Sequence, residues 1–155
     1  MGNENENPLS LASSSSTIKS LDSVRRGKAG LDAHRQVMLM RVPESGQWAS
    51  FERDSLELKD LAYLTAKTGD EFAILRGKKE DILFHGGRSC NFTGLVYDNL
   101  LDHKLKLIGH SHPGEDDPVA SSDDRAVLRL IEQKTSFIIS GRTGRITEFT
   151  ANPFE

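Results

Sequence analysis

Short apolar segments alternate with amphipathic segments along residues 34–155, and this order constrains the fold more than any other feature of the chain. Apolar runs bounded by turn residues are typical of strands, and apolar residues spaced at i, i+3 and i+4 are typical of helices. Helices are predicted over Ser55–Lys67 and Ser122–Gln133. Strands are predicted over 36–42, 71–77, 81–85, 104–110, 136–140 and 145–150. The mixed order predicts one α/β (α+β) domain in which helices flank a mixed β-sheet.

Local signals add detail to this expectation. Asp54 or Ser55 can cap the start of the first helix, and Gly69 suits the position just after its end. The short connection between 71–77 and 81–85 predicts a β-hairpin. A second hairpin is expected at the end of the chain, and Trp48 is expected in the core.

Residues 1–33 differ from the rest in composition. Residues 1–20 hold six serines and three asparagines and no aromatic residue, and a basic patch follows at Arg25, Arg26 and Lys28. Such a segment buries too little apolar surface to offset the entropy of ordering, so residues 1–33 are predicted to be a disordered tail. No basic region precedes an apolar stretch as in a secretory signal. We expect a cytoplasmic bacterial protein, or one exported as an effector without such a signal.

Charge and cysteine content exclude several classes of function. The chain has 20 basic and 23 acidic residues, which argues against nucleic-acid binding because phosphate binding needs a surplus of Lys and Arg. No run of 18 apolar residues is present, so no membrane span is expected. Cys90 is the single cysteine, which excludes an internal disulfide and a CxxC motif. A metal site would therefore use His, Asp and Glu.

The chemistry-bearing segment is Gly109–Asp124, which contains His110, His112, Ser121 and Asp124. Two residues apart on an extended segment, the two imidazoles point the same way and can converge on one cation. The predicted helix then returns the carboxylate of Asp124. Two His and one carboxylate are a zinc-binding set with a fourth position for water. Taken alone, Ser121 and Asp124 also fit a helix N-cap, a role compatible with Ser121 binding an oxyanion.

The pattern His110-x-His112-Pro113, seven residues, then Ser121-x-x-Asp124 resembles the JAMM motif of MPN (JAB) domain zinc metalloproteases of bacterial type. The usual gap from Pro to Ser is about six residues. The resemblance implies that His110, His112 and Asp124 bind one Zn²⁺ per chain and that Ser121 assists at the tetrahedral intermediate. It also implies an MPN/JAB-like domain over residues 34–155, with a layout similar to that of cytidine deaminases.

The same resemblance calls for a glutamate general base on an earlier strand. Glu71 follows the first predicted helix and begins an apolar strand. Glu80 is the rival, but it lies in the charged turn Lys78–Asp81, where solvation is expected. Glu71 is therefore the predicted base, since that role needs a carboxylate within one water of the reacting atoms.

The expected function is zinc-dependent hydrolysis of a peptide or isopeptide bond in a protein or peptide substrate, with no nucleic-acid or membrane partner. A secreted-toxin or effector context is the biological setting that the resemblance suggests. The alternative is a non-catalytic MPN-type scaffold or interaction domain. Phosphoesterases and amidohydrolases that use His-x-His need further histidines downstream, and no His follows His112. Structural or surface roles are expected for His34, His85 and His103, and a solvated loop for Glu115, Asp116 and Asp117.

Overall fold

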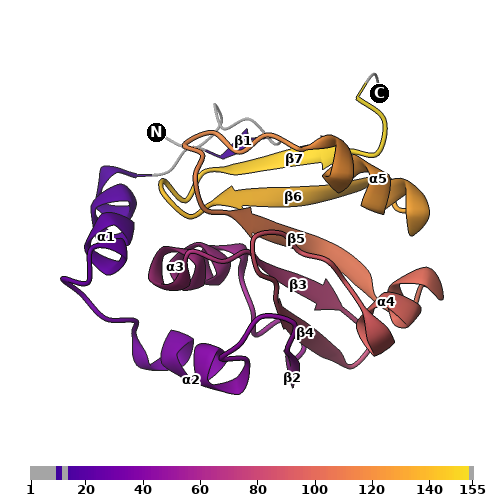
Figure 1. The fold of residues 1–155 in the computed structure, drawn as a ribbon, viewed down its shortest axis with the longest axis horizontal. Helices are drawn as coiled ribbons and strands as arrows, with labels where there is room; N and C mark the ends of the chain where they lie inside the picture. The colour runs from indigo at the N-terminus through magenta and orange to yellow at the C-terminus, as the bar shows by residue number, and fades with distance from the viewer. Residues whose placement is uncertain (1–9, 12–13, 154–155) are drawn as a thin grey trace.

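The computed structural model describes residues 10–11 and 14–153, which form a mixed α/β domain around an open seven-stranded sheet (Figure 1). The described helices are α1 (Ser15–Arg25), α2 (Ala33–Arg41), α3 (Leu58–Thr68), α4 (Gly94–Leu101) and α5 (Ser122–Leu130). The strands are β1 (Ser10–Leu11), β2 (Trp48–Glu52), β3 (Phe72–Arg76), β4 (Glu80–His85), β5 (Lys106–His112), β6 (Thr135–Ser140) and β7 (Ile146–Thr150). The α/β class and the flanking helices expected from the sequence are thus confirmed.

The sheet has the strand order β1-β7-β6-β5-β3-β4-β2. Strands β5 and β6 pair in parallel, and the other neighbouring pairs are antiparallel. Both predicted hairpins, β3–β4 and β6–β7, are present. Strand β5 lies at the centre of the sheet. Because β5 and β3 are antiparallel, the carboxyl end of β5 lies beside the amino end of β3.

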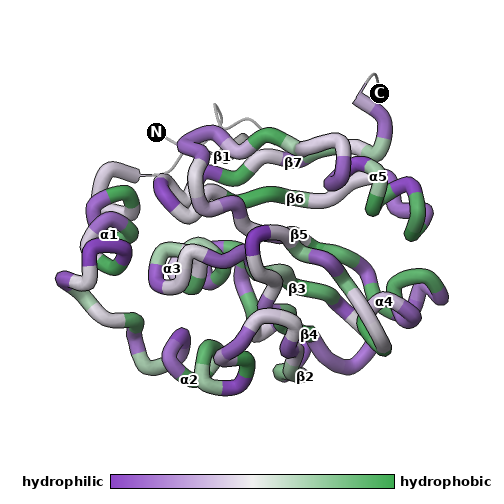
Figure 2. Tube along the Cα trace, in the orientation of Figure 1, coloured by the Kyte–Doolittle hydropathy of each residue, from purple (hydrophilic) through white to green (hydrophobic). Residues whose placement is uncertain are grey.

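Each face of the sheet carries its own core, because successive residues of a strand point to opposite faces. In β3, Phe72 and Ile74 join the core beneath α1, α2 and α3, whereas Ala73 and Leu75 join the core beneath α4 and α5. Figure 2 shows the hydrophobic stretches along these central strands. This two-sided burial explains why the central strands read as continuous apolar runs rather than as alternating ones.

Helix α3 forms close to its predicted position, but its start differs. The residue before its first turn is Glu57, whose backbone N–H donates to Asp60 Oδ2 at 2.9 Å, so neither Asp54 nor Ser55 is the cap. Asp60 is buried and also accepts from Arg35 Nε at 3.0 Å. Gly69 ends the helix with a φ of 81°, a left-handed conformation that glycine adopts without strain.

The strand predicted over residues 36–42 is wrong, because this segment belongs to α2. Asp32 caps α2 by accepting a hydrogen bond from the backbone N–H of Arg35 at 2.9 Å. Met38 is buried, whereas Val37 and Met40 are 52% and 76% exposed. A short apolar run does not by itself distinguish a strand from a helix. In this segment the N-cap at Asp32 and burial on one side only are features of an amphipathic helix.

The disordered tail predicted for residues 1–33 is also wrong from residue 15 onward. Ser14 caps α1, and Leu21, Val24 and Leu31 are buried in the core on the α3 side. Tyr63 of α3 donates a hydrogen bond to Ser20 Oγ at 2.8 Å. The apolar residues beyond position 20 thus find a partner surface on α3. Residues 10–11 of the predicted tail form β1, which pairs with β7, and residues 1–9 and 12–13 lie outside the described residues.

Two further elements were not predicted. Strand β2 pairs with β4 at one edge of the sheet, and its first residue, Trp48, is 43% exposed rather than in the core. Helix α4 occupies part of the segment 86–103, for which the sequence indicated only mixed structure. None of the helices in residues 14–153 combines the length and apolar character needed to cross a bilayer.

Candidate metal centre

Strand β5 presents the two histidines of the motif on one side and a serine on the other. His110 and His112 are both buried, and their ring centroids are 4.9 Å apart. Ser111 points away from them, and its hydroxyl accepts from the backbone N–H of Phe72 at 2.9 Å. This hydroxyl also lies 2.5 Å from Thr65 Oγ1 of α3. The buried serine therefore fixes the end of β5 from the opposite face.

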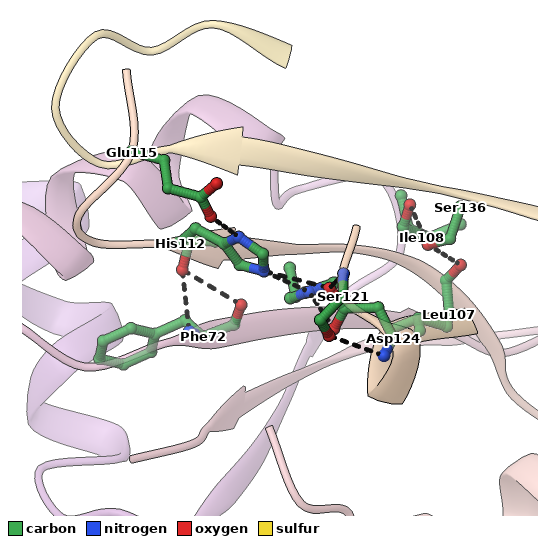
Figure 3. Close-up of polar contacts among 10 residues, drawn as sticks. Phe72, Leu107, Ile108, His112, Glu115, Ser121, Asp124 and Ser136 are labelled. Carbon is green, nitrogen blue, oxygen red and sulfur yellow. Dashed lines mark hydrogen bonds and ion pairs between the residues drawn. The ribbon is translucent and has the colours of Figure 1, made fainter. Parts of the chain in front are cut away.

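Asp124, in the first turn of α5, contacts both imidazoles. Its Oδ1 lies 3.0 Å from His110 Nε2, and its Oδ2 lies 3.3 Å from His112 Nε2. The two Nε2 atoms are 3.1 Å apart. Figure 3 shows His112 and Asp124 facing each other across this space. The structure thus brings together the three predicted ligands, although they come from a strand and a helix separated by a loop.

The spacing of these donor atoms fits a zinc ion. Zinc binds histidine nitrogen and carboxylate oxygen at about 2.0–2.2 Å in tetrahedral geometry, which places neighbouring ligand atoms about 3.3 Å apart. The two Nε2 atoms, 3.1 Å apart, are close to that spacing, and each lies 3.0–3.3 Å from a different oxygen of the Asp124 carboxylate. Imidazole nitrogen and carboxylate oxygen are also donors suited to zinc. The residues present therefore fit the metal that the sequence motif implies.

Glu71 precedes β3 and offers a second carboxylate to the same space. One of its oxygens lies within 4.8 Å of donor atoms of His110 and His112. Its main chain is fixed on both sides, since its N–H donates to Gly87 O and its carbonyl accepts from Gly86, both at 2.8 Å. Burial raises the pKa of Glu71. The nearby positive charge of His110 and His112 lowers this pKa, but by less than burial raises it. Glu80, the rival base, is exposed on β4 and is not part of this cluster.

Ser121 is the N-cap of α5 and lines the cleft that opens beside Asp124 and Glu71. Its Oγ accepts from the backbone N–H of Asp124 at 3.0 Å, and Asp124 Oδ2 accepts from the backbone N–H of Ser121 at 2.9 Å. These two bonds form a capping box, so the capping role considered from the sequence is present. The Ser121 hydroxyl acts as an acceptor here, which leaves its own proton able to donate to a ligand in the cleft.

Glu115 is a member of the site that sequence reasoning missed. Its Oε1 lies 2.6 Å from His112 Nδ1, where an N–H donates to the carboxylate (Figure 3). Because Nδ1 donates to Glu115, Nε2 is the ring nitrogen that would offer its lone pair to a bound metal. The signal available in the sequence was a glutamate three residues after a histidine across the turn Pro113–Gly114.

A solvated loop was expected for Glu115, Asp116 and Asp117. Asp116 and Asp117 are exposed, as expected, but the loop is also held to the sheet. Ser140 Oγ donates to the carbonyl of Glu115, and Arg142 Nε donates to Asp116 Oδ1 at 2.9 Å. Arg145 pairs with Asp117. These contacts come from the end of β6 and the turn that follows it, so the final hairpin positions the loop that carries Glu115.

Charge in the site follows from these contacts. Burial by itself lowers the pKa of His112, but hydrogen bonds to Asp124 and Glu115 outweigh burial and raise it to about 9. Burial would raise the pKa of Asp124, but hydrogen bonds from His110 and His112 hold it well below its usual range. Negative charge from the carboxylates therefore stabilises positive charge at the centre of the cluster.

The cluster opens into a cleft of about 740 Å³. No Lys or Arg is among its described lining residues. Four acidic residues line it: Glu71, Glu115, Asp123 and Asp124. An acidic cleft attracts cations and disfavours anionic ligands.

The other histidines lie away from this cleft. His85 is buried at the end of β4, where its Nδ1 contacts Val42 O at 2.7 Å and its Nε2 contacts Asp70 Oδ2 at 2.8 Å. His34 lies 3.6 Å from Asp60, and His103 lies 3.3 Å from Glu132. Each of these histidines has a structural partner outside the cluster.

Comparison of the chain with protein-family models, with curated proteins and with solved structures found no significant match.

Proposed function

We propose that the chain is a zinc-dependent peptidase or isopeptidase of the JAMM type. The observation that carries this proposal is the convergence of His110 Nε2, His112 Nε2 and the Asp124 carboxylate at 3.0–3.3 Å. A cleft opens beside these atoms, and Glu71 stands at its wall. The motif in the sequence and the donor spacing in the fold support the same metal.

In this proposal His110, His112 and Asp124 hold the metal and Glu115 keeps the ring of His112 in position. Zinc in such a site supplies positive charge that polarises a carbonyl and makes water more acidic. The site is on rigid elements, because two ligands end a central strand and the third begins a helix. Such support keeps ligand positions constant between turnovers.

Glu71 is the proposed general base. It takes a proton from the attacking water at its carboxylate and returns that proton to the leaving amine as the carbon–nitrogen bond breaks. Its raised pKa suits this exchange, because a group that must both accept and donate works best when its pKa approaches the working pH. Ser121 donates its hydroxyl proton in a hydrogen bond to the substrate carbonyl oxygen as negative charge develops there.

Comparing new protein termini in lysates treated with zinc-loaded wild type or Glu71→Gln tests this function. We expect wild type to generate specific new termini or released isopeptide-linked partners, and Glu71→Gln to lower their rate of formation by about 10²–10⁴-fold. Glu80→Gln is the matched control, because Glu80 is exposed and distant from the cluster, and it should behave as wild type. Equal cleavage by Glu71→Gln would contradict the assigned base. No cleavage by zinc-loaded wild type would favour a non-catalytic scaffold.

A further inference from the structure

A second, apolar pocket adjoins the cleft on the side of α4 and α5. Its volume is about 160 Å³. Most of its wall is hydrophobic, formed by Phe92, Tyr97, Leu100, Val127, Leu130 and Ile131. No charged residue is among its described lining residues. The wall thus differs in character from the acidic cleft beside it.

The pocket and the cleft of the candidate metal centre share part of their walls. Cys90, Val127 and Leu130 line both the cleft and the pocket. Cys90 and Val127 also border a small hollow together with His110 and Asp124. Because residues three apart share a helix face, Val127 lies one turn of α5 beyond Asp124. At a rise of about 1.5 Å per residue, that separation along the helix axis is only about 4.5 Å.

Leu130 is an apolar side chain that the fold leaves uncovered. It is 54% exposed at the end of α5, whereas Leu128 on the same helix is fully buried. It lines both the cleft and the pocket. A ligand that fills the pocket would cover Leu130 and remove its apolar surface from water, which is favourable.

The size of the pocket matches one side chain. An engineered protein cavity of about 150 Å³ lined by Leu, Ile and Phe binds benzene. A volume of about 160 Å³ therefore suits an aromatic ring or a branched aliphatic group. It is too small for a helix or a second strand.

We propose that this pocket receives an apolar side chain, of the size of Phe or Leu, on the substrate residue next to the bond that is cleaved. The assignment rests on the proposed function, because the occupant is defined by its distance from the metal centre. The acidic cleft also disfavours acidic substrate residues, since an Asp or Glu at the same position would meet like charge and an apolar wall. The substrate is thus a neutral or basic peptide with one apolar anchor beside the scissile bond.

Amino-acid hydroxamates test the pocket by binding alone, without turnover. Zinc-loaded wild type is titrated by calorimetry with the N-acetyl hydroxamates of phenylalanine, leucine, glycine and aspartate. The hydroxamate chelates zinc in every case, so only the side chain differs. We expect the phenylalanine and leucine compounds to bind about 10- to 200-fold more tightly than the glycine compound, the range typical for apolar groups in apolar pockets. The aspartate compound should bind most weakly.

Substitutions at exposed leucines test the pocket without disturbing the fold, because exposed side chains contribute little to stability. Leu130→Ser should reduce the preference for phenylalanine over glycine while zinc binding remains. Leu95→Ser is the matched control, because Leu95 is 64% exposed on α4 and lies outside the cleft and the pocket. Binding of all hydroxamates with equal affinity, or an unchanged preference in Leu130→Ser, would overturn the pocket and leave the zinc hydrolase standing. Failure of wild type to bind zinc would overturn both.

Discussion

Glu115 gives His112 a defined orientation, and its contribution can be measured apart from catalysis. Carboxylates that hydrogen-bond to a ligating histidine fix its tautomer and raise its basicity. The 2.6 Å contact at Nδ1 is of this kind. The residue touches no other member of the ligand set, so its effect passes through His112 alone.

Replacement of Glu115 should weaken zinc binding without abolishing it. We expect Glu115→Ala to raise the zinc Kd by about 10- to 100-fold, as removal of such outer partners does elsewhere. Competition with a chromogenic chelator measures the change. Asp116→Asn is the matched control from the same loop, since Asp116 pairs with Arg142 and not with a histidine. An unchanged Kd in Glu115→Ala would show that the contact does not orient the ligand.

The thiol of Cys90 reports on the carboxylates of the cluster. Burial raises the pKa of Cys90 well above its usual value, and the negative charges of Glu71 and Asp124 raise it further. Because only the thiolate is alkylated, zinc-free protein should react with iodoacetamide at pH 8 more slowly than unfolded protein does. Glu71→Gln removes one negative charge and should speed the reaction. A rate in Glu71→Gln equal to or below that of wild type would place Glu71 away from Cys90.

The candidate site was largely predictable from sequence because its residues occur in local patterns. His110 and His112 share a strand face, and Ser121 with Asp124 begins a helix, so a strand, a loop and a helix define most of the cluster. Glu71 followed from the family resemblance together with the order of elements. Glu115, Cys90 and the apolar pocket were not predictable, because their contacts depend on how irregular loops fold back onto the site.

At the scale of elements, predictions failed where composition was averaged over a segment. Residues 1–20 are rich in serine, yet α1 forms because a few apolar residues lie on the face that meets α3. Residues 36–42 contain an apolar run that suits a strand as well as a helix, and the surface available for packing decides between them. Both errors concern tertiary contacts, which local propensity does not contain.

The contribution of α1 to stability can be tested at a buried position. Leu21 is completely buried, so Leu21→Ala should lower the free energy of unfolding by about 2–5 kcal/mol through lost burial and a residual cavity. Urea denaturation followed by circular dichroism measures this change. Ile18→Ala on the same helix is the control, because Ile18 is 41% exposed and its truncation should cost much less. Equal, small effects at both positions would mean that α1 adds little to the fold.

At the scale of the whole molecule, the sheet order explains where the site forms. The direction of pairing changes at β5, which is antiparallel to β3 and parallel to β6. Helix α5 is the crossover between β5 and β6, so its first turn returns to the carboxyl end of β5 and brings Asp124 to the histidines. The antiparallel neighbour β3 begins at the same end of the sheet, so Glu71, which precedes β3, also lies beside the histidines. One change in pairing direction thus places both carboxylates beside the imidazole pair.

In the proposed enzyme His110, His112 and Asp124 bind zinc, whereas Glu71 acts on the substrate. Equilibrium dialysis against zinc, followed by metal analysis, compares wild type, His112→Ala and Glu71→Gln side by side. We expect about one zinc ion per chain in wild type and Glu71→Gln, and loss of zinc in His112→Ala. Wild type that binds no zinc, or His112→Ala that retains zinc as wild type does, would contradict this assignment of the ligands.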